Sequence, residues 1–477
     1  MERSTYEPSK PRLAWLSGFL LLLPAALGVT GFLLAGGCPV QDAMFRCLTM
    51  YVLNYGEKPP NLLVELARWT APLATASGLL LALSRMQERL RAFLRRLRGD
   101  SVAVYGPEAE RERLLAQLGR RGIRGGERLV KARRYILLDS EEENLRFYRR
   151  HSEALRGRRV YLRCEGLSPL AQPDEGVRLF SCEETAARLY WKTHSLYPAL
   201  SAAGQETDVV LLGFGKLGEE LLYWGLQYNV FSPEQRIRYH VFGDAAELLA
   251  VRWGLQQIGD PVLVHSEAWY ESLELLAHAG RVLVLEQQDQ GRLLNRLLTA
   301  VPQADITVFS NGSAAVEQLA QGNPICLFDW FGEATKPEGI LEDRLYANAQ
   351  ALHRMYQDLY QGKSWEELDA FTRYSNVSAA DYHEIRLQML ERLGYGRAAC
   401  EALPEKTRTL LAELEHERWC RYHYLNNWRC GVPEDGANKD PVRRIHVDLK
   451  PFSALKDAEK KKDYDNLRLL LSRSGQI

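Results

Sequence analysis

The alternation of hydrophobic and polar positions divides the chain into three parts with different predicted structures. Near the N-terminus, residues 13–37 contain no charged side chain, and residues 62–84 form a second apolar stretch. A helix rises about 1.5 Å per residue, so the first stretch is long enough to cross the roughly 30 Å hydrocarbon core of a bilayer. The pattern therefore predicts a transmembrane helical hairpin within residues 1–98, which ends in a basic linker helix.

Basic residues flank both predicted spans. Lys10 and Arg12 precede the first span, and a series of arginines follows the second between positions 85 and 98. Cytoplasmic flanks of membrane helices carry an excess of lysine and arginine, so both termini and the soluble part are expected on the cytoplasmic side of the inner membrane. A cleaved signal peptide that ends at Cys38 is the alternative, but the apolar run is long for a signal and a second span follows.

Two charged residues lie inside the second apolar stretch. Glu65 and Arg68 are three residues apart on one face of the predicted helix. They can pair with each other, extend to the membrane interface or line an aqueous path, so they are candidate pore residues. The segment that joins the two spans, residues 43–60, can hold a short re-entrant or interfacial helix.

Short apolar strands alternate with amphipathic helices through the middle of the chain. This order predicts an α/β fold with two tandem parallel-sheet domains, at 99–203 and 204–340. In the first domain Gly106 follows a strand, but the second and third glycines of a dinucleotide fingerprint are missing and Glu108 would repel a phosphate. We interpret this domain as a degenerate copy that serves assembly.

The second α/β domain carries a fuller fingerprint. Gly213, Gly215 and Gly218 follow one strand and begin a helix, and Asp244 ends the next strand. Such glycines permit a tight turn, close approach of the backbone to a pyrophosphate and close helix–strand packing, while the acid accepts hydrogen bonds from ribose hydroxyls. We predict a regulatory site for NAD or another adenine nucleotide. A scaffold with an empty site is the alternative.

Beyond residue 340 the pattern of apolar residues becomes that of helices, and it predicts a helical connector at 341–402. In the module that follows, His416, Cys420 and His423 share one helical face. A zinc site is disfavoured because the outer two lie about 10.5 Å apart along the helix axis, whereas zinc needs all its donors within about 2.3 Å. We predict no metal site.

The same module contains candidate ligand contacts. Trp419 and Trp428 can offer flat faces to a purine, and Lys439, Arg443 and Arg444 can offer charge to phosphates. The alternative is that both tryptophans belong to the core and the basic residues form a solvated loop.

Composition narrows the function classes. The chain has 61 Lys+Arg and 61 Asp+Glu, so no global basic field points to nucleic acid. Its eight cysteines form no CxxC pairs, which argues against a disulfide framework and a zinc ribbon. The α/β domains show no Tyr-x-x-x-Lys pair, and spacing identifies no His–Asp pair, so no catalytic residues are assigned and we do not expect an enzyme.

Two family resemblances complete the picture. The stretch ARRYILLDSEEENL at 132–145 resembles the RCK (TrkA-N-like) Rossmann domains that are attached to many two-span channels. Residues 403–477 resemble the ryanodine-receptor repeat (RyR) domain through LAELEHERW, NNWRCG and HVDLKPFSAL, with Asn427 in place of the usual glycine. The first resemblance implies a regulatory Rossmann domain, and the second implies a small, mainly helical sensory module.

Together these resemblances imply a ligand-regulated ion channel or pore-forming effector in the lipid bilayer. Nucleotide binding to the Rossmann or RyR domains would gate a homo-oligomer, with a tetramer favoured, and the architecture resembles effectors of bacterial antiviral defence. A membrane-anchored nucleotide sensor or scaffold without a pore is the alternative. An NAD-dependent enzyme is a less favoured one.

Overall fold

The chain folds into two compact units, Met1–Gly99 and Asp100–Ile477. The computed structural model describes residues 10–97, 99–126, 128–170, 176–310, 312–342, 344–396 and 402–472. Side chains are described for the same residues except 10–21, 80–97, 344–345 and 469–472.

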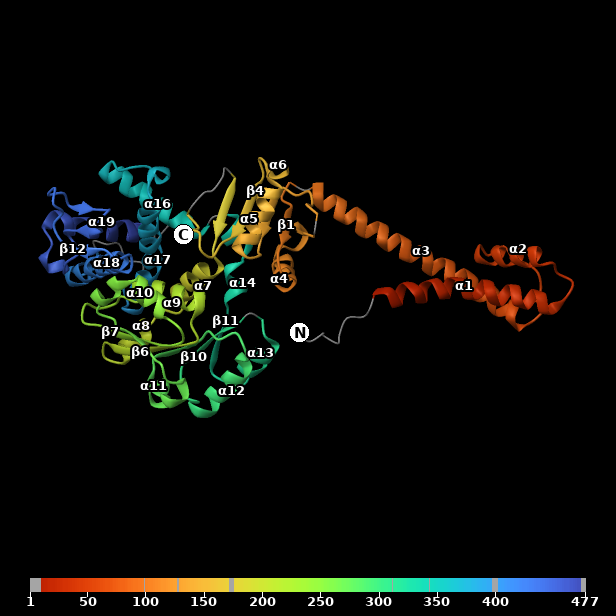
Figure 1. The fold of residues 1–477 in the computed structure, drawn as a ribbon, viewed down its shortest axis with the longest axis horizontal. Helices are drawn as coiled ribbons and strands as arrows, with labels where there is room; N and C mark the ends of the chain where they lie inside the picture. Colours follow the sequence, from red (N-terminus) through yellow and green to blue (C-terminus); the bar gives the residue numbers. More distant parts are fainter. Residues whose placement is uncertain are drawn as a thin grey trace. The chain divides into compact units, whose positions relative to one another are not determined.

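Three helices make up the N-terminal unit (Figure 1): α1 is Lys10–Ala35, α2 is Val40–Tyr51 and α3 is Leu62–Leu97. Within the described residues, no helix has a stretch that is both long enough and apolar enough to cross a membrane. The two spans predicted from the sequence are therefore not confirmed, and parts of both, at 13–21 and 80–84, lie outside the described side chains.

Small residues bring α1 close to its neighbours. A Cβ atom at Gly28 would lie 2.5 Å from Sγ of Cys47, and one at Gly31 would lie 2.7 Å from Cγ2 of Val64. Asn61 fastens the start of α3, because its Oδ1 accepts a hydrogen bond from the N–H of Val64 and its Nδ2 donates to the carbonyl of Gly31. Close helix approach through glycine is typical of helices that associate within a bilayer.

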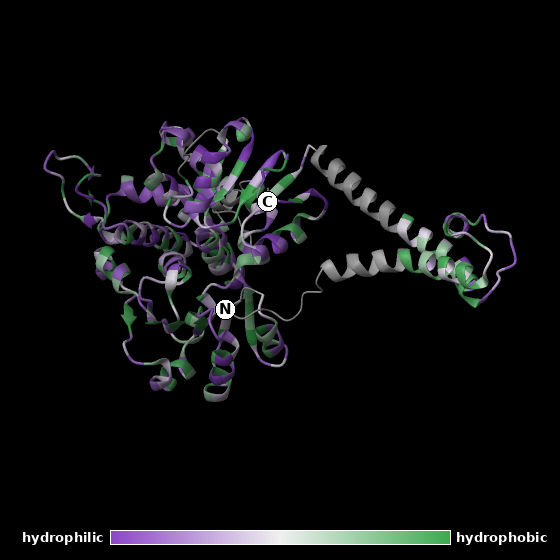
Figure 2. Ribbon diagram, turned by 45° about the vertical axis from the view of Figure 1, so that its right-hand side comes forward, coloured by the Kyte–Doolittle hydropathy of each residue, from purple (hydrophilic) through white to green (hydrophobic). Residues whose placement is uncertain are grey.

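The surface of the N-terminal unit is rich in exposed apolar side chains. Much of the coloured part of its helices is hydrophobic (Figure 2). Trp69 and Leu73 are each 69% exposed, and Phe45 is 68% exposed. Other exposed large apolar side chains of this unit include Leu22, Leu34, Met44, Leu48, Val52, Leu53, Leu62 and Leu79. An apolar surface of this extent marks a region that contacts lipid or another protein.

The second unit begins with a five-stranded parallel sheet in the order β2-β1-β3-β4-β5. Its strands are β1 (Val102–Tyr105), β2 (Gly122–Arg124), β3 (Arg134–Leu137), β4 (Arg159–Arg163) and β5 (Val177–Phe180). The helices between them are α4 (Glu108–Leu118), α5 (Glu141–Arg150) and α6 (Ser152–Leu155). This is the flavodoxin-like order of a doubly wound fold.

A six-stranded parallel sheet follows, in the order β11-β10-β9-β6-β7-β8. Its strands are β6 (Glu206–Leu212), β7 (Arg236–Phe242), β8 (Val262–Val264), β9 (Arg281–Val284), β10 (Ile306–Ser310) and β11 (Ile325–Asp329). Its helices are α9 (Gly215–Tyr228), α10 (Ala246–Val251), α11 (Leu273–His278), α12 (Gln290–Ala300), α13 (Ala314–Ala320), α14 (Trp330–Ala334) and α15 (Pro337–Leu341). Strand order reverses between β6 and β9, as in dinucleotide-binding Rossmann folds, so the predicted pair of parallel α/β domains is confirmed.

Helix α7 (Cys182–Thr193) joins the two sheets and is buried along most of its length; the short α8 (Tyr197–Ala202) leads from it into β6. Trp191 of α7 packs against Gly225 of α9, where an added Cβ would lie 3.0 Å from the indole ring. The indole Nε1 of Trp191 donates a hydrogen bond to the carbonyl of Leu221, 2.8 Å away. Side chains of both sheets and of α7 therefore form one continuous core.

The C-terminal part is mainly helical. It contains α16 (Arg344–Tyr360), α17 (Ala370–Arg392), α18 (Glu405–Leu425) and α19 (Asp457–Ser472). A small sheet pairs β12 (Arg429–Cys430) and β13 (Lys439–Asp440) with β14 (Ile445–His446). Helices at the predicted positions are confirmed, whereas the RyR assignment of this module stays a prediction.

Asn427 attaches the C-terminal module to the second sheet domain. Its backbone is left-handed, with φ +61, which explains why glycine or asparagine suits this position. The side-chain Nδ2 donates to the carbonyl of Val251 (2.7 Å), and Oδ1 accepts from the N–H of Gly254 (3.2 Å). Gly254 must lack a side chain, because a Cβ there would lie 2.0 Å from the carbonyl oxygen of Tyr424.

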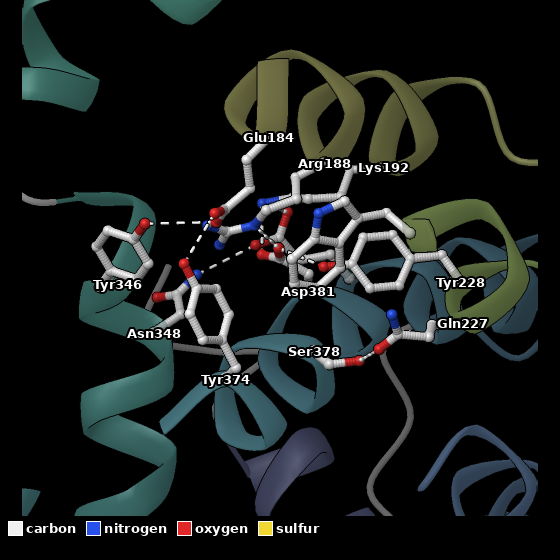
Figure 3. Close-up of polar contacts among 12 residues, drawn as sticks. Glu184, Arg188, Lys192, Gln227, Tyr228, Tyr346, Asn348, Tyr374, Ser378 and Asp381 are labelled. Carbon is white, nitrogen blue, oxygen red and sulfur yellow. Dashed lines mark hydrogen bonds and ion pairs between the residues drawn. The ribbon is translucent and has the colours of Figure 1, made fainter. Parts of the chain in front are cut away.

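A buried ion network joins α7, α9 and α17 (Figure 3). Nε of Arg188 donates to Oδ2 of Asp381 at 2.6 Å, and Nη1 donates to Oε1 of Glu184 at 3.2 Å. Tyr228 of α9 donates to the same Asp381 oxygen at 2.7 Å, and Lys192 lies 3.3 Å from the other. Burial alone would raise the pKa of Asp381, but Arg188 and Lys192 lower it. The carboxylate is therefore charged and paired.

We expect Asp381→Ala to destabilise the second unit by about 3–5 kcal/mol, because it would leave the buried Arg188 with Glu184 as its remaining carboxylate partner in this network and would remove a carboxylate from Lys192. Urea unfolding of the full chain, followed by tryptophan fluorescence, measures the effect. Glu384→Gln is the matched control: it removes another carboxylate bound to Lys192, but one whose side chain is 36% exposed. Equal losses for both variants would contradict the structural role assigned to Asp381.

Candidate nucleotide site

The three glycines after β6 adopt the geometry of a phosphate-binding turn. Gly213 has φ +84, and a Cβ there would lie 2.8 Å from the backbone nitrogen of Glu286. Gly215 has φ +57, and nothing lies within 4 Å of the position of its Cβ. A Cβ at Gly218 would lie 2.8 Å from the ring of Phe214. The first and third glycines thus permit close packing, and the second leaves the turn open.

The N-terminus of α9 faces this turn. No side chain of the described residues caps the helix, so its first N–H groups are available to an anion. Lys216 lies in the first turn, exposed, with its Nζ 3.4 Å from Glu219 and 3.6 Å from Glu220. Backbone donors and one lysine at a helix N-terminus form a suitable cradle for a phosphate.

Asp244 lies at the same edge of the sheet as the glycine turn. Leu212 at the end of β6 pairs in register with Phe242 at the end of β7, and Asp244 follows two residues later. Its carboxylate is exposed, and Oδ1 accepts a hydrogen bond from the N–H of Ala246 at 3.2 Å. The structure therefore brings the four residues predicted for cofactor binding to one edge, in the positions that suit pyrophosphate and ribose.

An open cavity of about 520 Å³ lies at the carboxyl ends of β9 and β10. Strand β9 pairs directly with β6, so this cavity lies next to the point where the strand order reverses, but no residue of the glycine turn lines it. Dinucleotides bind at such reversal points in open α/β sheets. The residues that line it are Gln287, Asp289, Gln290, Gly291, Arg292, Gly312 and Ser313.

Glu220, two residues after Gly218, is a half-buried acid. Its Oε2 accepts a hydrogen bond from Nε1 of Trp224 at 3.1 Å. Burial, with repulsion from Glu184, raises the pKa of Glu220 to about 7, although Lys216 and Arg252 act in the opposite direction. This group links the edge of the nucleotide site to the buried network around Glu184.

The corresponding turn of the first sheet domain is arranged differently. Gly106 has φ +137, and a Cβ there would lie 2.8 Å from Cβ of Leu138. Glu108 at the start of α4 pairs with Arg124 at 2.8 Å, and Glu112 pairs with the same arginine. Acidic side chains therefore lie in the first turns of α4, where they would disfavour a phosphate, and the interpretation of this domain as a degenerate copy stays a prediction.

The five residues proposed as ligand contacts in the C-terminal module do not converge. Trp419 is half-buried and lines a cavity. Trp428 is buried and stacks on Phe371, with ring centroids 5.2 Å apart. Arg443 pairs with Glu434, Arg444 donates to a backbone carbonyl, and Lys439 is exposed on β13. The cavity beside Trp419 is lined by none of the other four.

The two candidate pore residues lie near the start of α3. Glu65 is exposed and Arg68 is half-buried. They form no ion pair with each other in the described part of the chain. Their role in a pore stays a prediction.

Spacing along the sequence did not identify a series of hydrogen-bonded side chains on the second sheet. Asp208 accepts from Nε2 of His240 at 3.0 Å, and Nδ1 of His240 lies 2.9 Å from Nε2 of His265. Nδ1 of His265 is 2.6 Å from Glu267. The first three residues come from β6, from β7 and from just after β8, so only the order of the strands in the sheet brings them together.

Comparison with known proteins gives only distant matches. No family model and no curated protein matches the chain. Among solved structures, it is similar to a GsuK mutant (14% identity, TM-score 0.34, 70% of this chain and 97% of that one). It is also similar to one component of the dipicolinate synthase of Bacillus halodurans, with 9% identity and a TM-score of 0.23 over 52% of this chain and 98% of that one. A D-lactate dehydrogenase from Treponema pallidum is similar with 11% identity and a TM-score of 0.21 over 56% of this chain and 99% of that one. At these scores the matches carry no argument, and the nucleotide site rests on its geometry.

We expect Gly215→Asn to lower the affinity for NAD or ATP about tenfold or more while the fold stays intact. Asparagine tolerates a positive φ, and the open space beside Gly215 accepts its side chain, which would then obstruct a phosphate. Titration calorimetry measures the affinity. Gly119→Asn, at φ +53 with equally open surroundings, is the matched control in the first domain and should bind as the parent does.

Glu220 should make stability depend on pH. A glutamate has a pKa of about 4.3 in an unfolded chain, so folding favours the protonated form of Glu220. Its contribution to stability is fully present below about pH 4 and is lost as the pH rises through 7. Relative to Glu220→Gln, the parent should lose roughly 1–3 kcal/mol in urea unfolding between pH 5 and pH 8. Glu247→Gln, at an exposed glutamate that does not act on the pKa of Glu220, should keep the parent's pH dependence.

Proposed function

We propose that this protein is a nucleotide-regulated membrane protein. In this proposal NAD or another adenine nucleotide binds the turn at Gly213–Gly218 and controls a pore formed by the N-terminal hairpins of a homo-oligomer, with a tetramer favoured. The observation that carries the nucleotide part is the open turn at Gly215, at the point where strand order reverses and opposite the exposed carboxylate of Asp244.

The exposed apolar side chains of the N-terminal unit support its placement in a membrane. Trp69, Leu73 and Phe45 would face lipid or neighbouring copies, since water does not favour so much apolar surface. Insertion into the inner membrane, with the second unit in the cytoplasm, is part of the proposal. A role in bacterial defence would be one use of such a pore.

The buried network supplies a route from the nucleotide to the C-terminal module. Helix α9 begins at the glycine turn, carries Glu220 beside Lys216 in its first turns, and contributes Tyr228 to the Asp381 cluster near its end. A phosphate that draws Lys216 away would leave Glu220 without that counter-charge. A ligand can shift a conformational equilibrium only if it binds one state more tightly. Helix α9 is a single rigid element that contacts both the glycine turn and the Asp381 cluster.

The alternative is a membrane-anchored nucleotide sensor without a pore. An anchor does not need charged side chains within its apolar helix, whereas a pore would use Glu65 and Arg68 to line a polar path. The double substitution Glu65→Leu, Arg68→Leu should abolish conduction and leave membrane attachment unchanged if the pore exists.

Flux through reconstituted vesicles tests the proposal. Full-length protein in phosphatidylethanolamine–phosphatidylglycerol vesicles should release an entrapped ion about tenfold faster with saturating NAD or ATP than without. Gly215→Asn should remove the stimulation, and Gly119→Asn should retain it. Background flux despite measured nucleotide binding and vesicle flotation would favour the sensor. Failure to float with the vesicles would overturn the membrane part.

A further inference from the structure

A second cavity, of about 320 Å³, lies inside the C-terminal module. Helices α16 to α19 and the loop after β14 form its walls. It is distinct from the candidate nucleotide site, because its lining includes neither a residue of the glycine turn nor one of the cavity at the ends of β9 and β10. Its volume suits a small planar molecule or the planar end of a larger one.

One wall of this cavity is an aromatic platform. The half-buried indole of Trp419 contacts three imidazoles. That of His423 is nearest, with centroids 4.1 Å apart and an interplanar angle of 46°, and the other two line the cavity. The ring of His416 is nearly parallel to the indole, with centroids 5.6 Å apart and an interplanar angle of 25°. The ring of His446 meets it edge-on, at 5.0 Å and 82°. Neighbours on two sides hold the indole in place, and a fixed aromatic face attracts planar groups and cations.

A carboxyl group lies near each of the two imidazoles that line the cavity, those of His416 and His446. Oδ2 of Asp463 is 3.7 Å from Nδ1 of His416, and Oδ2 of Asp448 is 3.9 Å from Nδ1 of His446. Both separations exceed hydrogen-bond distance. Burial lowers the pKa of both histidines, so they are neutral near pH 7 and supply little counter-charge.

Asp463 is a largely buried acid in the wall of this cavity. No lysine or arginine of the described chain forms an ion pair with it. Burial, with repulsion from Glu415, raises its pKa well above the usual range, although Arg418, Arg386 and Lys462 oppose this. The two arginines are already bound to Glu415, at 2.8 and 3.3 Å. A cation or a pair of N–H donors in the cavity would stabilise the Asp463 carboxylate.

We propose that this cavity binds a planar guanidine-type edge, meaning two adjacent N–H donors on a flat group. Such an edge would stack on Trp419 and donate to the carboxylate of Asp463, with Asp448 adding negative potential. Both a guanidinium compound and a guanine base present this chemistry. The acids that line the cavity disfavour a phosphate inside it. This site goes beyond the proposed function, because it needs neither the glycine turn nor a membrane.

Titration calorimetry of the full chain with agmatine and with guanosine tests the proposal. At least one of the two should bind with a Kd of about 1 mM or tighter. Uridine and inosine lack the paired N–H donors of a guanidine and should not bind. Binding of agmatine alone would identify a guanidinium ligand, and binding of guanosine alone would identify a base; either supports the site. No binding of either probe overturns it.

Variants locate the binding. Asp463→Asn should weaken it at least tenfold and keep the fold, because asparagine has nearly the shape of aspartate but carries no negative charge. Trp419→Leu should weaken it to a similar extent. Lys439→Gln with Arg443→Gln, on the exposed loop, is the control and should leave the affinity unchanged. Unchanged binding by Asp463→Asn would overturn the assignment.

Two further readouts separate this site from other effects. Agmatine should favour the ionised form of Asp463, so its affinity should fall as the pH is lowered through the range in which Asp463 titrates in the parent and not in Asp463→Asn. Gly215→Asn should bind agmatine or guanosine as the parent does. Loss of binding in Gly215→Asn would contradict a separate site, whereas loss of NAD binding alone leaves this proposal standing.

Discussion

The second unit depends on one buried ion pair, between Arg188 of α7 and Asp381 of α17. Both side chains are almost completely shielded from water, so each carries a desolvation cost that its partner must offset. An apolar contact can slide with little loss, but two buried charges have few arrangements of low energy. The pair therefore holds α7 and α17 in one register, and Tyr228 holds α9 with them through the same carboxylate.

This constraint gives α9 two roles. Its N-terminus forms the glycine turn of the candidate nucleotide site, and its later turns contact the ion pair on which the packing depends. Lys216 and Glu220 lie on the same helix as Tyr228, which contacts Asp381. A movement of the N-terminus of α9 therefore also moves its contact with Asp381. The proposed response to nucleotide follows from this geometry: the ligand site and the network belong to the same rigid element.

The C-terminal module shows how one aromatic-rich stretch is divided between structure and recognition. Trp428 is buried against Phe371, and Asn427 uses its left-handed backbone and amide to attach the module to α10. Trp419, nine residues earlier, keeps part of its ring free beside a polar cavity. Packing thus assigns one tryptophan to the core and leaves the other for a ligand, a division that spacing along the helix does not reveal.

The sequence by itself determined the features that depend on near neighbours in the chain. Most strands of the two sheets and the turn at Gly213–Gly218 were predictable because runs of buried residues and glycines at positive φ leave local signatures, whereas the short β2 and β5 were not predicted. The pairing of Arg188 with Asp381, which are 193 residues apart, was not predictable: Glu184, Arg188 and Lys192 have the spacing of an ordinary charged helix surface. Only the packing of α7 against α9 and α17 decided that these charges are buried, because removal of water depends on what covers a side chain and not on its spacing along the helix.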